Sequence, residues 1–133
     1  MNWRLVFALS GFGVAMGFLT VFFIPSNVEP VFWLVIFLFC AWVIARRVER
    51  RHYLHGLMVG IVNSVWMTAV RAWFVDVYLA RHPNEAALAA GMSYSPRVII
   101  LLTGPVIGVL SGVLLALLAF VAAKFIKRPA PAR

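Results

Sequence analysis

The chain has 133 residues, of which 64% are hydrophobic and only 12% are charged, and its mean hydropathy is +0.97. A soluble domain carries roughly 25% charged residues, so this chain has too little polar surface for a water-exposed exterior. The formal net charge of +8 does not indicate nucleic-acid binding, because seven of the twelve basic residues lie in two clusters, at 46–51 and 124–128, beside apolar runs.

Four apolar segments are candidates to cross a bilayer, which takes about 20 residues. They cover residues 3–24, 30–45, 53–80 and 98–126. The first is longer than the usual core of a secretory signal and lacks a small-x-small cleavage site, so we expect an uncleaved span. The second, 30–45, is short, and Pro30 should occupy its first turn. The sequence predicts an all-α, integral membrane four-helix bundle: one domain over 1–128 and a disordered tail at 129–133.

The connection after the third segment is the longest. Residues 84–90 favour a short helix that Gly91 stops, lying at the membrane interface. The loop around 46–51 and the end of the chain are rich in arginine and lysine, whereas the first loop has no basic residue. Because basic residues stay on the cytoplasmic side, we expect both termini in the cytoplasm and the chain in the bacterial cytoplasmic membrane.

Small residues recur at helical spacing on three of the four segments. Such residues mark faces where helices approach closely in lipid, so we expect the first, third and fourth segments to form the tight core. The aromatic-rich second segment should face lipid, or else an oligomer contact. The stripes comprise Ser10, Gly13, Gly17 and Thr20; Gly56, Gly60, Ser64, Thr68 and Ala72; and Gly104, Gly108, Gly112 and Ala116.

Charges at membrane depth are costly and are functional candidates. Arg71 is expected about one turn from the midpoint of the third segment, and Asp76 nearer its outer end. Asp76 should meet Arg97 or Arg81. Pro105 should kink the fourth segment and free the carbonyl of residue 101, which Arg71 could then bind; the alternative is that Arg71 snorkels to the headgroups.

Asn63, Ser64, Thr68 and Arg71 share one broad face of the third segment. This face indicates either hydrogen bonding between packed helices or a polar path for an ion, proton or small solute. Nothing in the sequence indicates an enzyme, a cofactor or a metal site. His52 and His55 lack acidic neighbours other than Glu49, and Cys40 is expected to be a buried apolar side chain.

The basic second loop, the opening of the third segment from Gly56 to Asn63, the acidic stretch around Glu85 and the glycine-striped last segment resemble a group of uncharacterised small bacterial four-span proteins. The resemblance covers most of the chain and implies no activity. Two function classes follow from the residues. One is a structural or accessory protein that acts in the lipid bilayer as a homo-oligomer or with a membrane partner. The other is a small transporter or channel whose path follows the third segment.

Overall fold

The structure is a computed structural model that describes residues 1–25 and 27–126, so the tail expected at 129–133 lies outside the described residues. The described residues form helices and no strand. In chain order, the helices are α1 (Trp3–Phe22), α2 (Glu29–Arg47), α3 (His52–Trp73), α4 (Val75–Arg81), α5 (Pro83–Ala90) and α6 (Pro96–Phe125).

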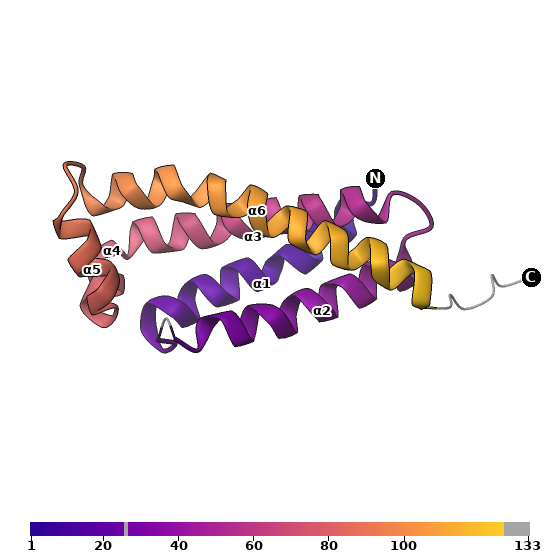
Figure 1. The fold of residues 1–133 in the computed structure, drawn as a ribbon, viewed down its shortest axis with the longest axis horizontal. Coiled ribbons are helices and arrows are strands. Elements are labelled where there is room, and N and C mark those ends of the chain that lie inside the picture. Colours follow the sequence, from indigo (N-terminus) through magenta and orange to yellow (C-terminus); the bar gives the residue numbers. More distant parts are fainter. Residues whose placement is uncertain (26, 127–133) are drawn as a thin grey trace, which may run out of the picture.

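Four of these helices, α1, α2, α3 and α6, are long and apolar enough to cross a membrane. The predicted all-helical chain with four apolar segments of spanning length is therefore confirmed. The four long helices lie side by side, and the short α4 and α5 cross one end of them (Figure 1). We call this the α5 end. The start of α1 and the end of α6 lie at the opposite end, here called the terminal end.

The third predicted segment, 53–80, is not one helix in the structure. It breaks at Phe74, so α3 has 22 residues and α4 follows as a separate helix. Arg97 Nε donates to the Ala72 carbonyl at 2.9 Å, which occupies the acceptor that an unbroken helix would pair with the amide of Asp76. Asp76 lies in the first turn of α4, where a carboxylate is favourable. Arg71 therefore lies in the last turn of α3 rather than near its middle.

Two predictions about helix ends are confirmed. Pro30 lies in the first turn of α2, and the short helix expected at 84–90 is α5, which Gly91 follows at its C-cap. Pro105 lies inside α6, which continues through it from Pro96 to Phe125. Its missing amide therefore does not end the helix.

The small-residue stripes of α3 and α6 pack against each other in antiparallel register. A Cβ added to any of the glycines concerned would lie within 3 Å of the opposite helix, which makes this the closest kind of helix contact. The facing pairs are Gly56 with Ala116, Gly60 with Gly112, Ser64 with Gly108, and Thr68 with Gly104.

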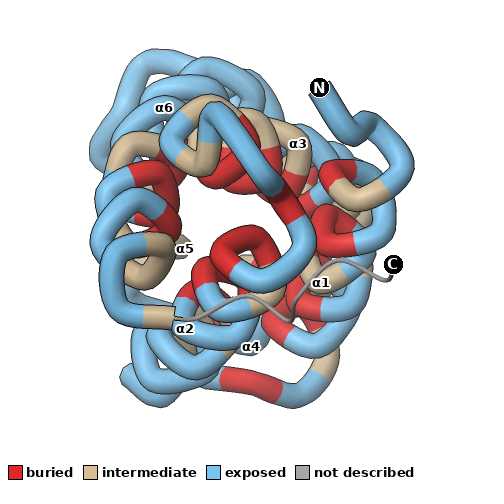
Figure 2. The backbone as a smooth tube through the Cα atoms, turned by 90° about the vertical axis from the view of Figure 1, so that its right-hand side faces the viewer, coloured by how far each residue is buried: buried red, intermediate tan, exposed pale blue. Residues whose placement is uncertain are grey.

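Helix α1 packs on another side of α3, where Gly13 meets the backbone of Asn63 and Gly17 meets Val70. The predicted contacts of α3 with its neighbours are thus confirmed. The expected peripheral position of α2 was wrong for half of that helix. Figure 2 shows buried residues turned inward from all four long helices. On α2 the inward residues are Phe37, Cys40, Ala41 and Ile44, which join Leu115 and Ala119 of α6 in the core.

Helix α2 packs closely only near the terminal end. Its buried residues begin at Phe37, and none of residues 29–36 is fully buried. Figure 1 shows α6 crossing α2 toward the terminal end and separating from it toward the α5 end. This divergence leaves room between α2 and the α3–α6 pair, and the candidate site lies there.

Candidate functional site

A cavity of about 620 Å³ lies at the α5 end between α2, α3 and α6, with α4 and α5 contributing to its wall. Its volume lies within the range of roughly 300–1,000 Å³ that is usual for ligand pockets. The residues that matter most for its chemistry are Glu29 and Trp33 from α2, Thr68 and Arg71 from α3, Tyr78 from α4 and Glu85 from α5.

An ion pair joins two walls of the cavity. Arg71 Nη2 donates to Glu29 Oε1 at 2.5 Å, and Trp33 Nε1 donates to the same oxygen at 3.2 Å. Glu29 lies in the first turn of α2 and Trp33 four residues later, which brings both side chains to one face. The pair is mostly enclosed, with 18% of the Arg71 side chain and 16% of the Glu29 side chain exposed.

The partner of Arg71 differs from both sequence expectations. Arg71 was expected to bind the carbonyl of Leu101 or to snorkel to the headgroups, and instead it pairs with Glu29. Arg71 lies in the last turn of α3, where the contact of Thr68 with Gly104 keeps it level with the first turns of α6. Its guanidinium nevertheless pairs with Glu29, because a charged carboxylate is a stronger acceptor for arginine than a neutral carbonyl.

Tyr78 and His82 hold α4 against this site. The Arg71 guanidinium lies 4.9 Å from the centre of the Tyr78 ring, and the His82 ring stacks on Tyr78 at 4.2 Å. Burial raises the pKa of Tyr78; Arg71 lowers it, while Glu29 and Glu85 raise it further. His82 Nδ1 lies 2.7 Å from the Tyr78 carbonyl and Nε2 lies 3.2 Å from the Ile24 carbonyl, which ties α4 to the chain beyond α1.

The cavity combines charged groups with a mostly apolar wall. The contact of Thr68 with Gly104 sets the register of α6 on α3, so Ile99 and Ile100 lie about level with Arg71 and Ile107 lies nearer the terminal end. Ser64 lies seven residues below Arg71 on α3, a drop of about 10 Å at 1.5 Å per residue. The site therefore presents an ion pair within a largely apolar chamber that continues past the pair toward the terminal end.

The glycine contact closes the side of this chamber where α3 meets α6. The Ser64 hydroxyl donates to the Gly104 carbonyl at 2.8 Å, and one turn further toward the terminal end Gly60 lies against the backbone of Gly112. Backbone packed against backbone leaves no room for a side passage between these two helices. Ser64 and Thr68 thus line the chamber, and the polar face does not continue past them between α3 and α6.

Asn63 is separated from the other residues of the predicted polar face. Its side chain is only 2% exposed, and its Oδ1 accepts from the backbone amide of Gly13 on α1 at 2.7 Å. Its Nδ2 is buried and has no partner among the described residues. Ser64, Thr68 and Arg71 line the cavity, whereas Asn63 lies in the α1–α3 contact.

Asp76, Arg97 and Pro105 do not line the cavity either. Arg97 uses its Nε for the Ala72 carbonyl instead of meeting Asp76, which is exposed on α4. Near the other end, His55 accepts from the amide of Asn2 through Nε2 at 3.0 Å, which fixes Nδ1 as the donor to the Arg51 carbonyl. His55 therefore joins the starts of α1 and α3. No group of three or more metal-binding side chains occurs among the described residues.

Glu29, Trp33 and Tyr78 were not singled out from the sequence as site residues. A signal for Glu29 was present. The chain has only four acidic residues, and an arginine near an apolar segment needs a carboxylate at the same end of the molecule. Glu29 opens an apolar helix at that end. Trp33 and Tyr78 gave no comparable signal, because aromatic residues are common throughout the chain.

Comparison with known proteins adds no relative. No family model, curated protein or solved structure matches the chain. The function must therefore be argued from the cavity and from the residues that surround it.

Proposed function

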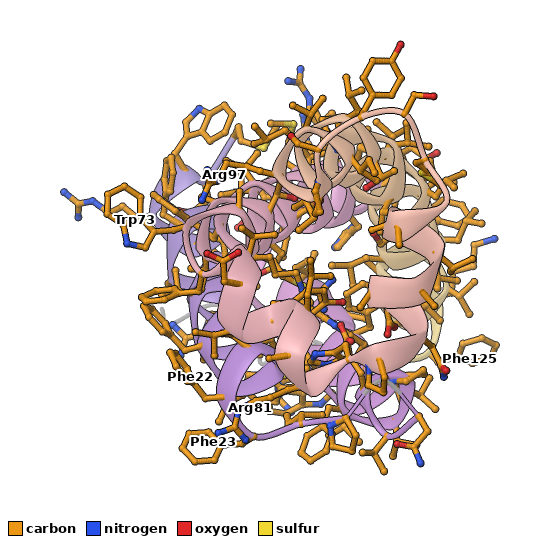
Figure 3. The ribbon with its side chains drawn as sticks, turned by 90° about the vertical axis from the view of Figure 1, so that its left-hand side faces the viewer. Phe22, Phe23, Trp73, Arg81, Arg97 and Phe125 are labelled. Atoms are coloured by element: carbon orange, nitrogen blue, oxygen red, sulfur yellow. The ribbon has the colours of Figure 1, made fainter. Side chains whose placement is uncertain are left out.

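We propose that the chain is a multi-pass protein of the bacterial cytoplasmic membrane, with both termini in the cytoplasm, that binds an amphiphilic molecule in the cavity at its α5 end. The membrane placement is supported by aromatic and basic residues at both ends of the long helices. At the α5 end, Trp73 and Phe23 project from the surface, with Arg97 and Arg81 at the same end (Figure 3). At the other end, the Arg46 guanidinium lies 5.2 Å from the Trp42 ring.

The orientation is supported by the distribution of charge. Arg46 and Arg47 end α2, the loop that follows carries Arg50 and Arg51, and Lys124 lies at the end of α6. All of these residues belong to the terminal end. Basic loops stay on the cytoplasmic side, so the α5 end and its cavity would face the outer leaflet.

The observation that carries the proposal is the Glu29–Arg71 ion pair on the wall of a largely apolar chamber. With α3 ending at Trp73, the pair lies where the headgroup region would be, and the chamber extends about 10 Å into the hydrocarbon. A molecule with a polar head and an apolar tail would satisfy both parts. A purely apolar ligand would offer no acceptor to the remaining N–H groups of Arg71, and a small solute would leave the apolar wall without a partner.

The ligand would enter sideways, between the diverging ends of α2 and α6. Ile107 is 56% exposed on the surface of α6 and also lines the cavity, so the chamber meets the lipid-facing surface at this residue. Entry by this route needs no opening toward water. The tail of a membrane lipid could therefore reach the chamber without leaving the bilayer.

This proposal favours the second of the two function classes that the sequence indicates. An accessory protein that binds through its glycine faces would need them to be free, and Gly56, Gly60, Gly104, Gly108 and Gly112 are used within the chain. A small transporter needs a binding chamber closed on one side, and the Gly60–Gly112 contact supplies that closure. Binding is the step that the geometry supports, and movement across the membrane would require this contact to open.

The experiment that tests the proposal fills the chamber from its open side. Ile107→Trp places a large side chain at the entrance, and Val106→Trp is the matched control, since Val106 is 60% exposed on the same helix and does not line the cavity. Native mass spectrometry of the purified protein should show one retained lipid-sized adduct for the wild type and for Val106→Trp, but not for Ile107→Trp. No adduct on the wild type, or equal adducts on both variants, would refute the proposal.

A further inference from the structure

The charges that line the cavity restrict the head group of its ligand. We infer that the ligand is an aminophospholipid, a lipid whose zwitterionic head carries an ammonium group beside a phosphate. This inference rests on the proposed amphiphile site. It adds a chemical class, and it can fail while that site stands.

The charged residues of the cavity wall favour a head group that contains a cation. Of the described residues that line the cavity, three are charged: Arg71 is basic, while Glu29 and Glu85 are acidic. Two carboxylates thus border the cavity beside one guanidinium. An anionic lipid would bring a further negative charge next to these carboxylates, which like-charge repulsion opposes. A head that includes an ammonium group adds a cation that a carboxylate can bind.

The guanidinium of Arg71 disfavours a head group that is only cationic. The bond between Arg71 and Glu29 uses Nη2 of the guanidinium, and the buried Nε has no acceptor among the described residues. Arginine has five N–H donors, so the guanidinium of Arg71 keeps donors for a second acceptor. A phosphate is one of the groups that arginine binds through two parallel hydrogen bonds. A ligand with a phosphate next to its ammonium would therefore match Arg71 and Glu29 at once.

The short distance between the charged groups of Arg71 and Glu29 restricts the head group further. Arg71 and Glu29 are already in contact at 2.5 Å, so a ligand that engages both must carry its positive and negative groups close together. A zwitterionic head meets this condition, with two carbons between the phosphate ester oxygen and the amine. Trp33 borders the same wall, and an indole ring attracts an ammonium group.

The apolar wall distinguishes a lipid from a soluble zwitterion. Ile99 and Ile100 line the cavity at the level of Arg71, Ile107 lines it further toward the terminal end, and Leu88 and Met92 contribute from the α5 side. A head group alone would leave this surface without a partner. An acyl chain would cover it, so most of the affinity should come from a ligand that has both parts.

The test compares four lipids with the same two acyl chains. These are phosphatidylethanolamine, anionic phosphatidylglycerol, a cationic trimethylammonium lipid and uncharged diacylglycerol, each titrated onto the delipidated full chain in detergent and quantified by native mass spectrometry. We expect the wild type to retain phosphatidylethanolamine about tenfold better than the other three, a difference of about 1.4 kcal/mol. Soluble glycerophosphoethanolamine, added at the same concentration, should not displace it.

Two variants test the roles of the charged residues. Glu29→Gln should lose the preference for phosphatidylethanolamine over phosphatidylglycerol, because the carboxylate that receives the ammonium is gone. Arg71→Met should shift the preference toward the cationic lipid, because the phosphate loses its donor. A general loss of structure would weaken the binding of all four lipids together and would not change the order of their affinities.

The outcomes separate the two proposals. If none of the four lipids binds the wild type, the amphiphile site itself is refuted. If all four lipids bind equally and Ile107→Trp abolishes the binding of all four, the amphiphile site stands and the head-group inference is wrong. Preference for phosphatidylglycerol, or displacement by glycerophosphoethanolamine, would likewise overturn the aminophospholipid assignment.

Discussion

Arg71 and Glu29 lie 42 positions apart in the chain, and their 2.5 Å contact joins the α5 ends of α3 and α2. The helices that carry them diverge there, so the pair spans the space in which the cavity forms. Each charge compensates the other in a site that is mostly enclosed. This relationship makes the pair both a structural tie and the polar end of the proposed binding site.

A double-mutant cycle on this pair should show strong coupling. Removing one charge with Glu29→Leu or Arg71→Met leaves the other partly buried and alone, and each change should lower the free energy of unfolding by about 1–3 kcal/mol. The double variant should be less destabilised than the sum of the two, by at least about 1 kcal/mol. Unfolding in mixed micelles with increasing denaturing detergent provides the measurement. Additive losses would show that the contact contributes no net stability.

The glycine contact between α3 and α6 gives a second prediction. A Cβ at Gly60 would collide with the Gly112 backbone, which cannot move without shifting the whole of α6. Gly60→Ala should therefore destabilise the protein by about 1–3 kcal/mol. The matched control is Gly11→Ala on α1, because nothing lies within 4 Å of a Cβ there. This variant should keep or slightly raise stability, since alanine favours helix. Equal effects in the two variants would refute the close packing of α3 and α6.

The sequence predicted this packing better than it predicted the site. Small residues at four-residue spacing on two segments can meet in only a few registers, so Gly60 and Gly112 were expected at a helix contact before their pairing was known. The Arg71–Glu29 pair depends on where α3 ends. Neither glycine nor proline marks the break at Phe74, and the residue that accommodates it, Arg97, comes 25 positions after Ala72. Local patterns carry no information about such a contact.

The sequence also could not predict which of Asn63 and Thr68 faces the cavity. Their positions on the helix allowed both to share one polar face, but whether a neighbouring helix covers that face is decided by tertiary packing. Helix α1 covers Asn63 and leaves Thr68 on the cavity wall. Periodicity alone could not separate the two residues.

Thiol labelling should separate these two positions experimentally. In a Cys40→Ser background, Thr68→Cys should react with a small water-soluble maleimide added to the protein in detergent, and Asn63→Cys should not react. The expected difference in initial rate is at least about tenfold, because the Asn63 side chain is buried in the α1–α3 contact. Addition of a bound amphiphile should slow labelling of Thr68→Cys. Rapid labelling of Asn63→Cys in folded protein would contradict the arrangement of α1 on α3.

Tyr78 should ionise late, with a consequence for stability at high pH. Burial raises the pKa of Tyr78 above its ordinary value of about 10, so the folded state holds the phenol proton more tightly than the unfolded state does. The stability that this provides is present below about pH 10 and is lost as the pH rises through the pKa of the folded state. The difference in 295 nm absorbance between wild type and Tyr78→Phe reports this group alone. Arg71→Met should delay ionisation further, because Arg71 lowers the pKa. A midpoint at or below pH 10 would contradict the burial of the hydroxyl.

His82 should control how firmly α4 and α5 are held over the cavity. Its ring is buried, stacks on Tyr78 and places Nε2 3.2 Å from the Ile24 carbonyl. His82→Phe keeps an aromatic ring but cannot donate to that carbonyl. Hydrogen exchange at the amides of α4 should then become about tenfold faster, as expected for the loss of roughly 1.4 kcal/mol of local stability. The core residues of α2 near Ile44 should keep their protection.

The neighbouring Arg81 supplies the control for this experiment, because its side chain is exposed. Arg81→Ala should leave the exchange of α4 unchanged, which would assign the effect to the His82 contact rather than to any substitution in the helix. If the cavity needs α4 in place to hold its ligand, His82→Phe should also weaken amphiphile binding, whereas Arg81→Ala should not. Unchanged exchange in His82→Phe would show that the Tyr78 stack alone fixes α4. In that case, Tyr78 rather than His82 would be the residue that keeps the cavity covered.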